Sequence, residues 1–140
     1  MILFFDGACE DGPSGTLDVG IGGVLLDPIA KAFRYFGGKV PPGLVRLWQS
    51  DGSKQVIGQA ELIPIVLGRR ARADRLANRL LLCFIDNESA RSGMVRDYSP
   101  NRHSAAIIEA AILEEILSAS FSWFPECRLS PIPQTPPAEA

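Results

Sequence analysis

The stretch LLLCFIDN, residues 80–87, is the most informative part of this 140-residue chain. Its continuous apolar run is typical of a strand buried on both faces of a parallel or mixed sheet. Asp86 and Asn87 end the run abruptly. An acidic side chain at the carboxyl end of such a strand lies where α/β folds place their ligand chemistry. The stretch therefore predicts an α/β sheet with a candidate site at the end of a central strand.

Three further strands are expected in the first third of the chain. Apolar runs predict strands over residues 2–9, 19–26 and 31–39. Asp27-Pro28 separates the last two and is typical of a hairpin connection, so the three strands are expected to form an antiparallel meander. The run Pro41-Pro42-Gly43 is expected to end the meander.

The spacing of apolar residues changes to a helical period in the middle of the chain. It predicts a helix from Gln59 to about Arg75. Pro64 would break a helix interior but is tolerated in a first turn, where amide groups lack partners. The helix is therefore expected to begin near Gln59, which places Glu61 in its first turn.

A short helix over residues 89–95, a long helix over 104–121 and a last strand over 121–129 complete the expected elements. The order predicts an α/β fold with a mixed sheet, in which an antiparallel three-strand meander is followed by helix, strand, helix and strand. Residues 1–129 are expected to form a single domain. Residues 130–140 are Pro-rich without periodicity and are expected to be a flexible tail.

Composition excludes several classes of protein. Hydrophobic residues make up 46% of the chain and charged residues 21%, which is enough to bury a core. The net charge of −2 excludes a polybasic protein that binds by bulk charge, and three cysteines do not make a disulfide scaffold. No apolar run approaches the ~20 residues of a membrane span. We therefore expect no membrane association and an intracellular location, cytoplasmic or nuclear.

Three carboxylates stand at special places in these elements: Asp6 in the first strand, Glu61 at the start of the first long helix and Asp86 at the end of the buried strand. Acids gathered at one site repel one another unless a cation lies between them, and carboxylates are the ligands that Mg²⁺ prefers. Each acid also has a plainer interpretation, as a turn residue or a helix cap. Their combination favours a metal site.

The motifs around these acids resemble the ribonuclease H-like superfamily, most closely the ribonuclease H-type domains of retroelement reverse transcriptases. The resemblance runs over residues 2–123 and rests on four segments in order: FFDGA at 4–8, GIGGVL at 20–25, QAEL at 59–62 and FIDNESA at 84–90. It implies that Asp6, Glu61 and Asp86 are the first three metal-binding and catalytic acids of the family. It also implies two Mg²⁺ (or Mn²⁺) ions, an RNA–DNA hybrid as substrate for cleavage of its RNA strand, and a reverse transcriptase domain of the same polyprotein as a partner.

The family's fourth acid, usually an Asp in a stretch like Asn-Pro-Ala-Asp, has no counterpart here. Glu126 and Glu139 are the only acids after the expected last strand begins, and neither stands in such a motif. The alternative hypothesis is therefore a degenerate, catalytically weak or inactive domain that binds nucleic acid or is only structural. A phosphate binder of the actin or sugar-kinase type would need a second similar domain, which 140 residues do not supply.

Four arginines gather at the end of the first long helix: Arg69, Arg70, Arg72 and Arg75. They are a weak candidate for a nucleic-acid backbone contact. A solvated helix face explains them at least as well.

The missing fourth acid leads to a prediction about the reading frame. Shifted by two bases, possible codons for residues 126–138 permit Val-Pro-Ser-Leu-Pro-Asn-Pro-Ala-Asp-Ala-Pro-Ser-Arg, whose Asp arises across the codons of Gln134 and Thr135. We hypothesise a single-base insertion or deletion near the codons of Pro125 and Glu126, by mutation or by gene-model error. Sequencing the transcript checks this, and native codons that do not encode that Asp in the alternative frame would disprove it.

Overall fold

The computed structural model describes residues 1–12, 15–53 and 55–126 of the chain. The strands are β1 (Ile2–Asp11), β2 (Leu17–Asp27), β3 (Ala32–Lys39), β4 (Leu80–Ile85) and β5 (Phe121–Trp123). The helices are α1 (Pro42–Trp48), α2 (Ile57–Ala71), α3 (Ala73–Leu76), α4 (Glu88–Arg96) and α5 (Arg102–Ser118). Within these ranges, no helix has the length and apolar character that a transmembrane segment requires.

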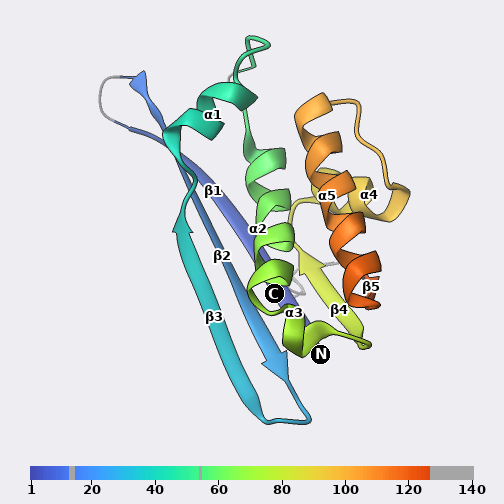
Figure 1. Cartoon of the computed structure of the whole chain (residues 1–140). Helices are drawn as coiled ribbons and strands as arrows, with labels where there is room; N and C mark the ends of the chain where they lie inside the picture. The colour runs from blue at the N-terminus through green and yellow to red at the C-terminus, as the bar shows by residue number, and fades with distance from the viewer. Residues whose placement is uncertain (13–14, 54, 127–140) are drawn as a thin grey trace, which may run out of the picture.

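The strands form one mixed sheet in the order β3-β2-β1-β4-β5 (Figure 1). β1, β2 and β3 pair antiparallel, whereas β4 runs parallel to β1 and β5 runs parallel to β4. The predicted α/β class, the antiparallel meander and the later parallel portion are therefore confirmed. β1 occupies the middle of the sheet because it pairs with an antiparallel neighbour on one edge and a parallel one on the other.

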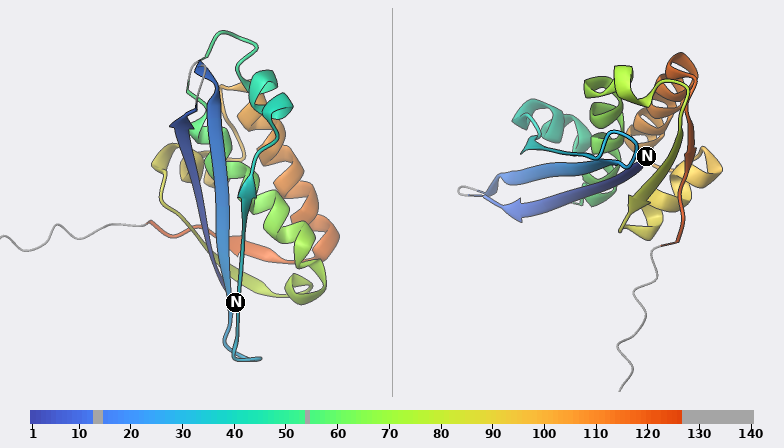
Figure 2. Two further views of the ribbon diagram at one scale, coloured as in Figure 1. Left: turned by 90° about the vertical axis from the view of Figure 1, so that its left-hand side faces the viewer. Right: turned by 90° about the horizontal axis from the view of Figure 1, so that it is seen from below.

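The helices α1, α2 and α5 cover one face of the sheet (Figure 2). α2 packs directly on β1 and β2, and α5 packs against α2. Burial alternates along β1, where Leu3 and Phe5 are buried while Phe4 is exposed, as expected for a strand with one covered face. The core lies between this face and the helices, with Ile65 of α2 and Ile108 of α5 fully enclosed.

Two helices differ from the sequence-based expectation at their starts. α1 was not predicted, because Pro41-Pro42-Gly43 resembles a chain break. Pro42 instead occupies the first turn of α1, where a missing N–H costs nothing, and burial of Trp48 holds the helix in place. The predicted start of α2 near Gln59 was also wrong, since α2 begins at Ile57 and Pro64 lies inside it.

The ends of the later elements also differ from the predicted ones. α2 stops at Ala71 and a separate short helix, α3, follows it. α5 begins at Arg102, because the Asn101 side chain caps it, and ends at Ser118, because Ala119 adopts a left-handed φ of 49°. β5 ends at Trp123, not at 129. Residues 127–129 and the expected tail 130–140 lie outside the described residues.

An ion pair connects the β2–β3 turn to the start of β4. The Asp27 carboxylate accepts hydrogen bonds from the backbone N–H groups of Ile29 and Ala30, at 3.1 and 3.3 Å. Arg79 donates to both oxygens of Asp27, at 2.9 and 3.2 Å. The Arg79 hydrogen bonds lower the pKa of Asp27 to about 2, so this carboxylate stays charged at neutral pH. The pair thereby fixes the hairpin against the parallel half of the sheet.

The interior proline of α2 coincides with its closest approach to the sheet. Pro64 has no N–H to donate to the carbonyl of Ala60, four residues earlier. Gly7 of β1 lies directly over that carbonyl, and a Cβ atom on Gly7 would overlap it. A strand residue without a side chain and a helix carbonyl without its usual donor therefore let β1 and α2 touch backbone to backbone.

We predict that Gly7→Ala destabilises the protein by at least about 1–3 kcal/mol, because the added methyl group forces β1 and α2 apart. Gly38→Ala in β3 is the matched control, since a Cβ there would meet nothing within 4 Å. Urea unfolding of both variants measures the difference. Equal stability of the two variants would contradict the close contact.

Candidate active site

The register of the two central parallel strands brings two of the predicted acids together. Phe5 of β1 lies opposite Ile85 of β4, so Asp6 and Asp86 follow at neighbouring positions on adjacent strands. Adjacent strands lie about 4.8 Å apart, which is within the span of two aspartate side chains. Both side chains are exposed. The sheet therefore presents two carboxylates side by side at the carboxyl end of β4.

The third acid, Glu61, enters the site from α2. It lies in the second turn of the helix, not the first, because α2 begins at Ile57. Glu61 is only 5% exposed, and the Gly7 backbone amide hydrogen-bonds its carboxylate. The Oε2 atom is buried without a hydrogen-bond partner. The contact of Gly7 with Ala60 thus positions both the helix and this carboxylate beside Asp6.

Burial, together with the charges of Asp6 and, less strongly, Asp86, raises the pKa of Glu61 to about 7, although the Gly7 hydrogen bond acts in the opposite direction. The three carboxylates are therefore electrostatically coupled. A buried carboxylate with an unpaired oxygen costs free energy unless a proton or a cation neutralises it.

A hollow of about 300 Å³ opens beside Asp6. Glycines keep it free of side chains, and Gly22 lies opposite Asp6 in the β1–β2 register. The hollow is lined by Asp6, Gly7, Ala8, Gly20, Ile21 and Gly22. The surface beside Asp6 is therefore open on the side of β2.

The donor set fits a hard divalent cation in charge and in chemistry, because it offers oxygen atoms only and one of them is a buried atom without a partner. In the described ranges, however, no three acidic, histidine or cysteine side chains are already gathered as ligands of one ion. The roles of these acids as metal ligands and catalytic residues stay predictions.

The four arginines lie at the opposite end of α2 from Glu61. Nine residues of helix separate Glu61 from Arg70, a rise of roughly 14 Å. Arg69 is buried and donates to Ser120 Oγ at 3.0 Å, so it takes no part in a surface patch. Arg70 pairs with Glu114 at 2.6 Å. Arg72 and Arg75 are half-buried, and a nucleic-acid contact by Arg70, Arg72 and Arg75 stays a prediction.

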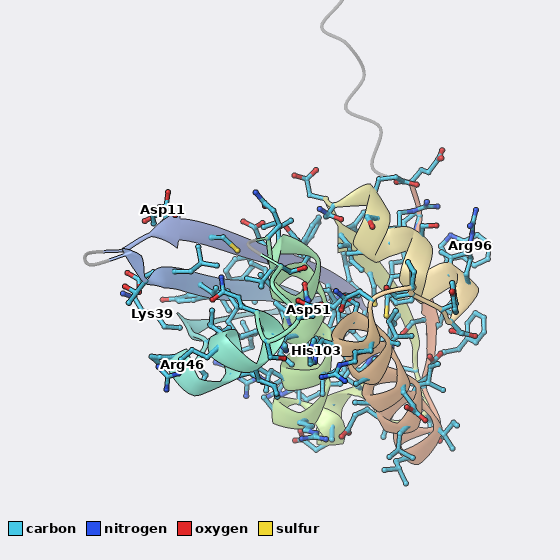
Figure 3. All side chains as sticks on the ribbon, turned by 90° about the horizontal axis from the view of Figure 1, so that it is seen from above. Asp11, Lys39, Arg46, Asp51, Arg96 and His103 are labelled. Carbon is cyan, nitrogen blue, oxygen red and sulfur yellow. The ribbon has the colours of Figure 1, made fainter. Side chains whose placement is uncertain are left out.

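Other side chains of types that often serve in catalysis do not join the carboxylates. His103 lies in the first turn of α5, near Asp51 (Figure 3), and lines a separate cavity between α1, α2 and α5. Burial and the charge of Glu61 raise the pKa of the Cys9 thiol, so this residue is not an activated nucleophile. Glu126 is exposed just beyond β5, and Glu139 lies outside the described residues.

Sequence reasoning missed the Gly7 backbone amide as a partner of Glu61. The signal was present in the Asp6-Gly7 pair, because a glycine inside a strand often marks a close approach of another backbone. It could not be connected to Glu61 without knowing that α2 crosses β1 at that point.

No family model matches the chain, and no curated protein matches it. Solved structures do. A type 1 RNase H from the halophilic archaeon Halobacterium salinarum is 14% identical, with a TM-score of 0.64 over 90% of this chain and 85% of that one. The chain has a ribonuclease H-like fold.

Two other structures with this ribonuclease H-like fold are similar to the chain. An N-terminal RNase H domain from Mycobacterium tuberculosis is 10% identical, with a TM-score of 0.58, covering 90% of this chain and 88% of that one. The protease–reverse transcriptase of prototype foamy virus is 9% identical, with a TM-score of 0.61; the match covers 89% of this chain but 17% of the viral one. At these identities, the likeness establishes the fold.

The raised pKa of Glu61 predicts how stability changes with pH. The pKa of this carboxyl group is about 7 in the folded state and about 4.5 in the unfolded state. The free energy of unfolding is therefore highest below pH 4.5 and falls as the pH rises from about 4.5 through 7. Glu61→Gln removes this loss, so in EDTA the variant gains up to about 3 kcal/mol over the wild type between pH 5 and pH 8.

Urea unfolding at several pH values measures this difference. Glu109→Gln, on the exposed side of α5, is the control because it removes the same charge from solvent. If the wild type and Glu61→Gln kept a constant stability difference across this range, the coupled carboxylate site would be wrong.

Proposed function

We propose that the chain is a metal-dependent endonuclease of the ribonuclease H type, which cleaves the RNA strand of RNA–DNA hybrids. The observation that carries this proposal is the buried, unpaired oxygen of Glu61 beside two exposed aspartates on adjacent strands. The arrangement lies at the carboxyl end of β4 and next to a glycine-lined hollow. The site residues carry the argument for this reaction. The ribonuclease H-like fold adds support by analogy with proteins of the same fold.

Asp6, Glu61 and Asp86 would hold the ions. Two Mg²⁺ or Mn²⁺ ions, when bound, supply activation of the attacking water and stabilisation of the leaving oxygen of a phosphodiester. The Gly7 amide hydrogen-bonds the Glu61 carboxylate and favours its charged form, which is the form that binds a cation. Gly20 and Gly22 leave room for the nucleic-acid backbone, so the scissile phosphate reaches the carboxylates without displacing a side chain. This mechanism needs no protein nucleophile.

The proposed setting is a retroelement polyprotein, with a reverse transcriptase domain as a neighbour and an RNA–DNA hybrid as partner. The structural likeness to part of a viral protease–reverse transcriptase supports it. The setting implies work in the cytoplasm or the nucleus, where reverse transcripts are made.

A second candidate is a domain of the same fold that binds hybrids without cutting them. One observation favours it: the described side chains do not form a ready-made three-ligand cluster. The absence of a motif for the fourth acid points the same way. Binding of a labelled hybrid in Ca²⁺, followed by a cleavage assay in Mg²⁺, separates the two candidates.

We predict that Asp86→Asn lowers Mg²⁺-dependent cleavage of a hybrid by at least about 100-fold, because loss of a ligand costs more than loss of a group that only orients one. The fold should persist, since Asp86 is exposed and its substitution is expected to cost less than about 0.5 kcal/mol.

A cleavage assay with purified protein, with and without EDTA, measures the effect. Asp74→Asn on α3 is the matched control, because it removes an exposed carboxylate from the helix that precedes the amino end of β4, whereas Asp86 follows the carboxyl end. Cleavage by Asp86→Asn at the wild-type rate would exclude this residue as a ligand. Hybrid binding without cleavage in the wild type would favour the second candidate.

A further inference from the structure

In the part of the chain that the structure describes, the face of the sheet that points away from α2 and α5 is apolar and exposed. In β4 and β5 the alternate residues Leu81, Cys83 and Ser122 are buried toward the helices, and the residues between them point outward. We call the outward surface the open face and define it by six large apolar side chains that are 37% to 76% exposed: Phe4, Phe33, Tyr35, Leu82, Phe121 and Trp123.

Strand register joins these side chains into continuous rows. One row crosses all five strands and contains Phe33, Leu26, Ile2, Leu82 and Trp123. The next row contains Tyr35, Val24, Phe4 and Phe84, and the rings of Phe4 and Phe84 stack with their centroids 5.0 Å apart. The open face is therefore one patch and not a set of scattered side chains.

The absence of charged side chains from the two rows indicates which kind of partner the open face can bind. Neither of the two rows contains a charged residue, whereas binding to a nucleic-acid backbone requires lysines and arginines. Aromatic enrichment with depletion of charge is typical of the buried centre of a protein–protein interface. The open face therefore fits a protein partner.

Its size fits a second copy of the chain. Aromatic side chains bury about 150–250 Å² each, so the exposed fractions of the five aromatic members leave on the order of 600 Å² uncovered. The largest apolar patch on a typical monomeric protein covers about 300–600 Å² and is often functional, so the open face lies at the upper end of that range. A standard interface takes about 800 Å² from each partner, which the open face and its rim approach.

We propose that two copies of this chain pack with their open faces against each other. A sheet with one apolar face can stack on a copy of itself at about 10 Å. Asp6 and Asp86 lie one row beyond the patch, toward the carboxyl end of β4. A two-fold axis that runs across the strands puts the carboxylates of the two copies at opposite ends, so they do not repel one another. The pairing is isologous, and it does not depend on the nuclease function.

Sedimentation equilibrium of the full chain over a wide concentration range tests this proposal. We expect a monomer–dimer equilibrium, and both Phe33→Glu and Trp123→Glu should raise the dimer dissociation constant at least about 30-fold. Leu117→Glu is the matched control, because Leu117 is 72% exposed and belongs to α5, a helix on the covered face of the sheet. Circular dichroism and thermal unfolding of each variant establish that it is folded.

Quenching of tryptophan fluorescence by acrylamide identifies the occupant, because Trp48 is buried and Trp123 is exposed. Protection of Trp123 that grows with protein concentration supports the dimer. A monomer at every concentration overturns it, as does a dimer that Leu117→Glu weakens as much as Trp123→Glu does. A monomer whose Trp123 is already shielded shows that the chain covers its own open face. A monomer shielded only by single-stranded DNA shows a nucleic-acid surface, and either result overturns the proposal.

Discussion

The contact between Gly7 of β1 and the backbone of Ala60 in α2 sets the distance between the sheet and the helix layer, and the candidate site depends on it. Asp6 precedes Gly7 and Glu61 follows Ala60, so the two acids are one residue away from the point where strand and helix touch. A larger separation would leave Glu61 facing solvent. Water would then solvate its carboxylate, remove the desolvation penalty and screen its attraction for a cation. The close contact converts a helix glutamate into a buried carboxylate of raised pKa.

The sequence allowed the sheet and the positions of Asp6 and Asp86 to be predicted, because both are local properties. An apolar run that stops at an acid identifies a strand end, and an Asp-Gly pair inside a strand is conspicuous. The burial of Glu61 was not predictable in the same way, since it depends on α2 crossing β1. The start of α2 was mispredicted because Pro64 suggested a first turn, whereas tertiary packing of Gly7 on Ala60 tolerates a proline in the helix interior.

The two faces of the sheet have different physical roles. The inner face makes the core, and the ion pair of Asp27 with Arg79 holds the hairpin half to the parallel half at the end opposite the carboxylates. The opposite face of the sheet carries the apolar side chains of the open face and, one row further along the strands, Asp6 and Asp86. Because these acids lie past the last apolar row, the proposed dimer and the proposed nuclease site use neighbouring parts of one surface without competing for the same residues.

The central position of β1 has a consequence for synthesis on the ribosome. Ile2 pairs with Leu82, so one edge of β1 stays without its partner strand until a segment 80 residues later has been translated. At about 5–20 residues per second, that edge stays unpaired for roughly 4–16 s. During this interval the β1–β3 hairpins present an apolar strand with free backbone N–H and C=O groups, which is a template for pairing with another chain. The nascent protein is therefore most vulnerable to aggregation after residue 39 and before residue 85 emerges, and a chaperone that binds apolar strands would act in that window.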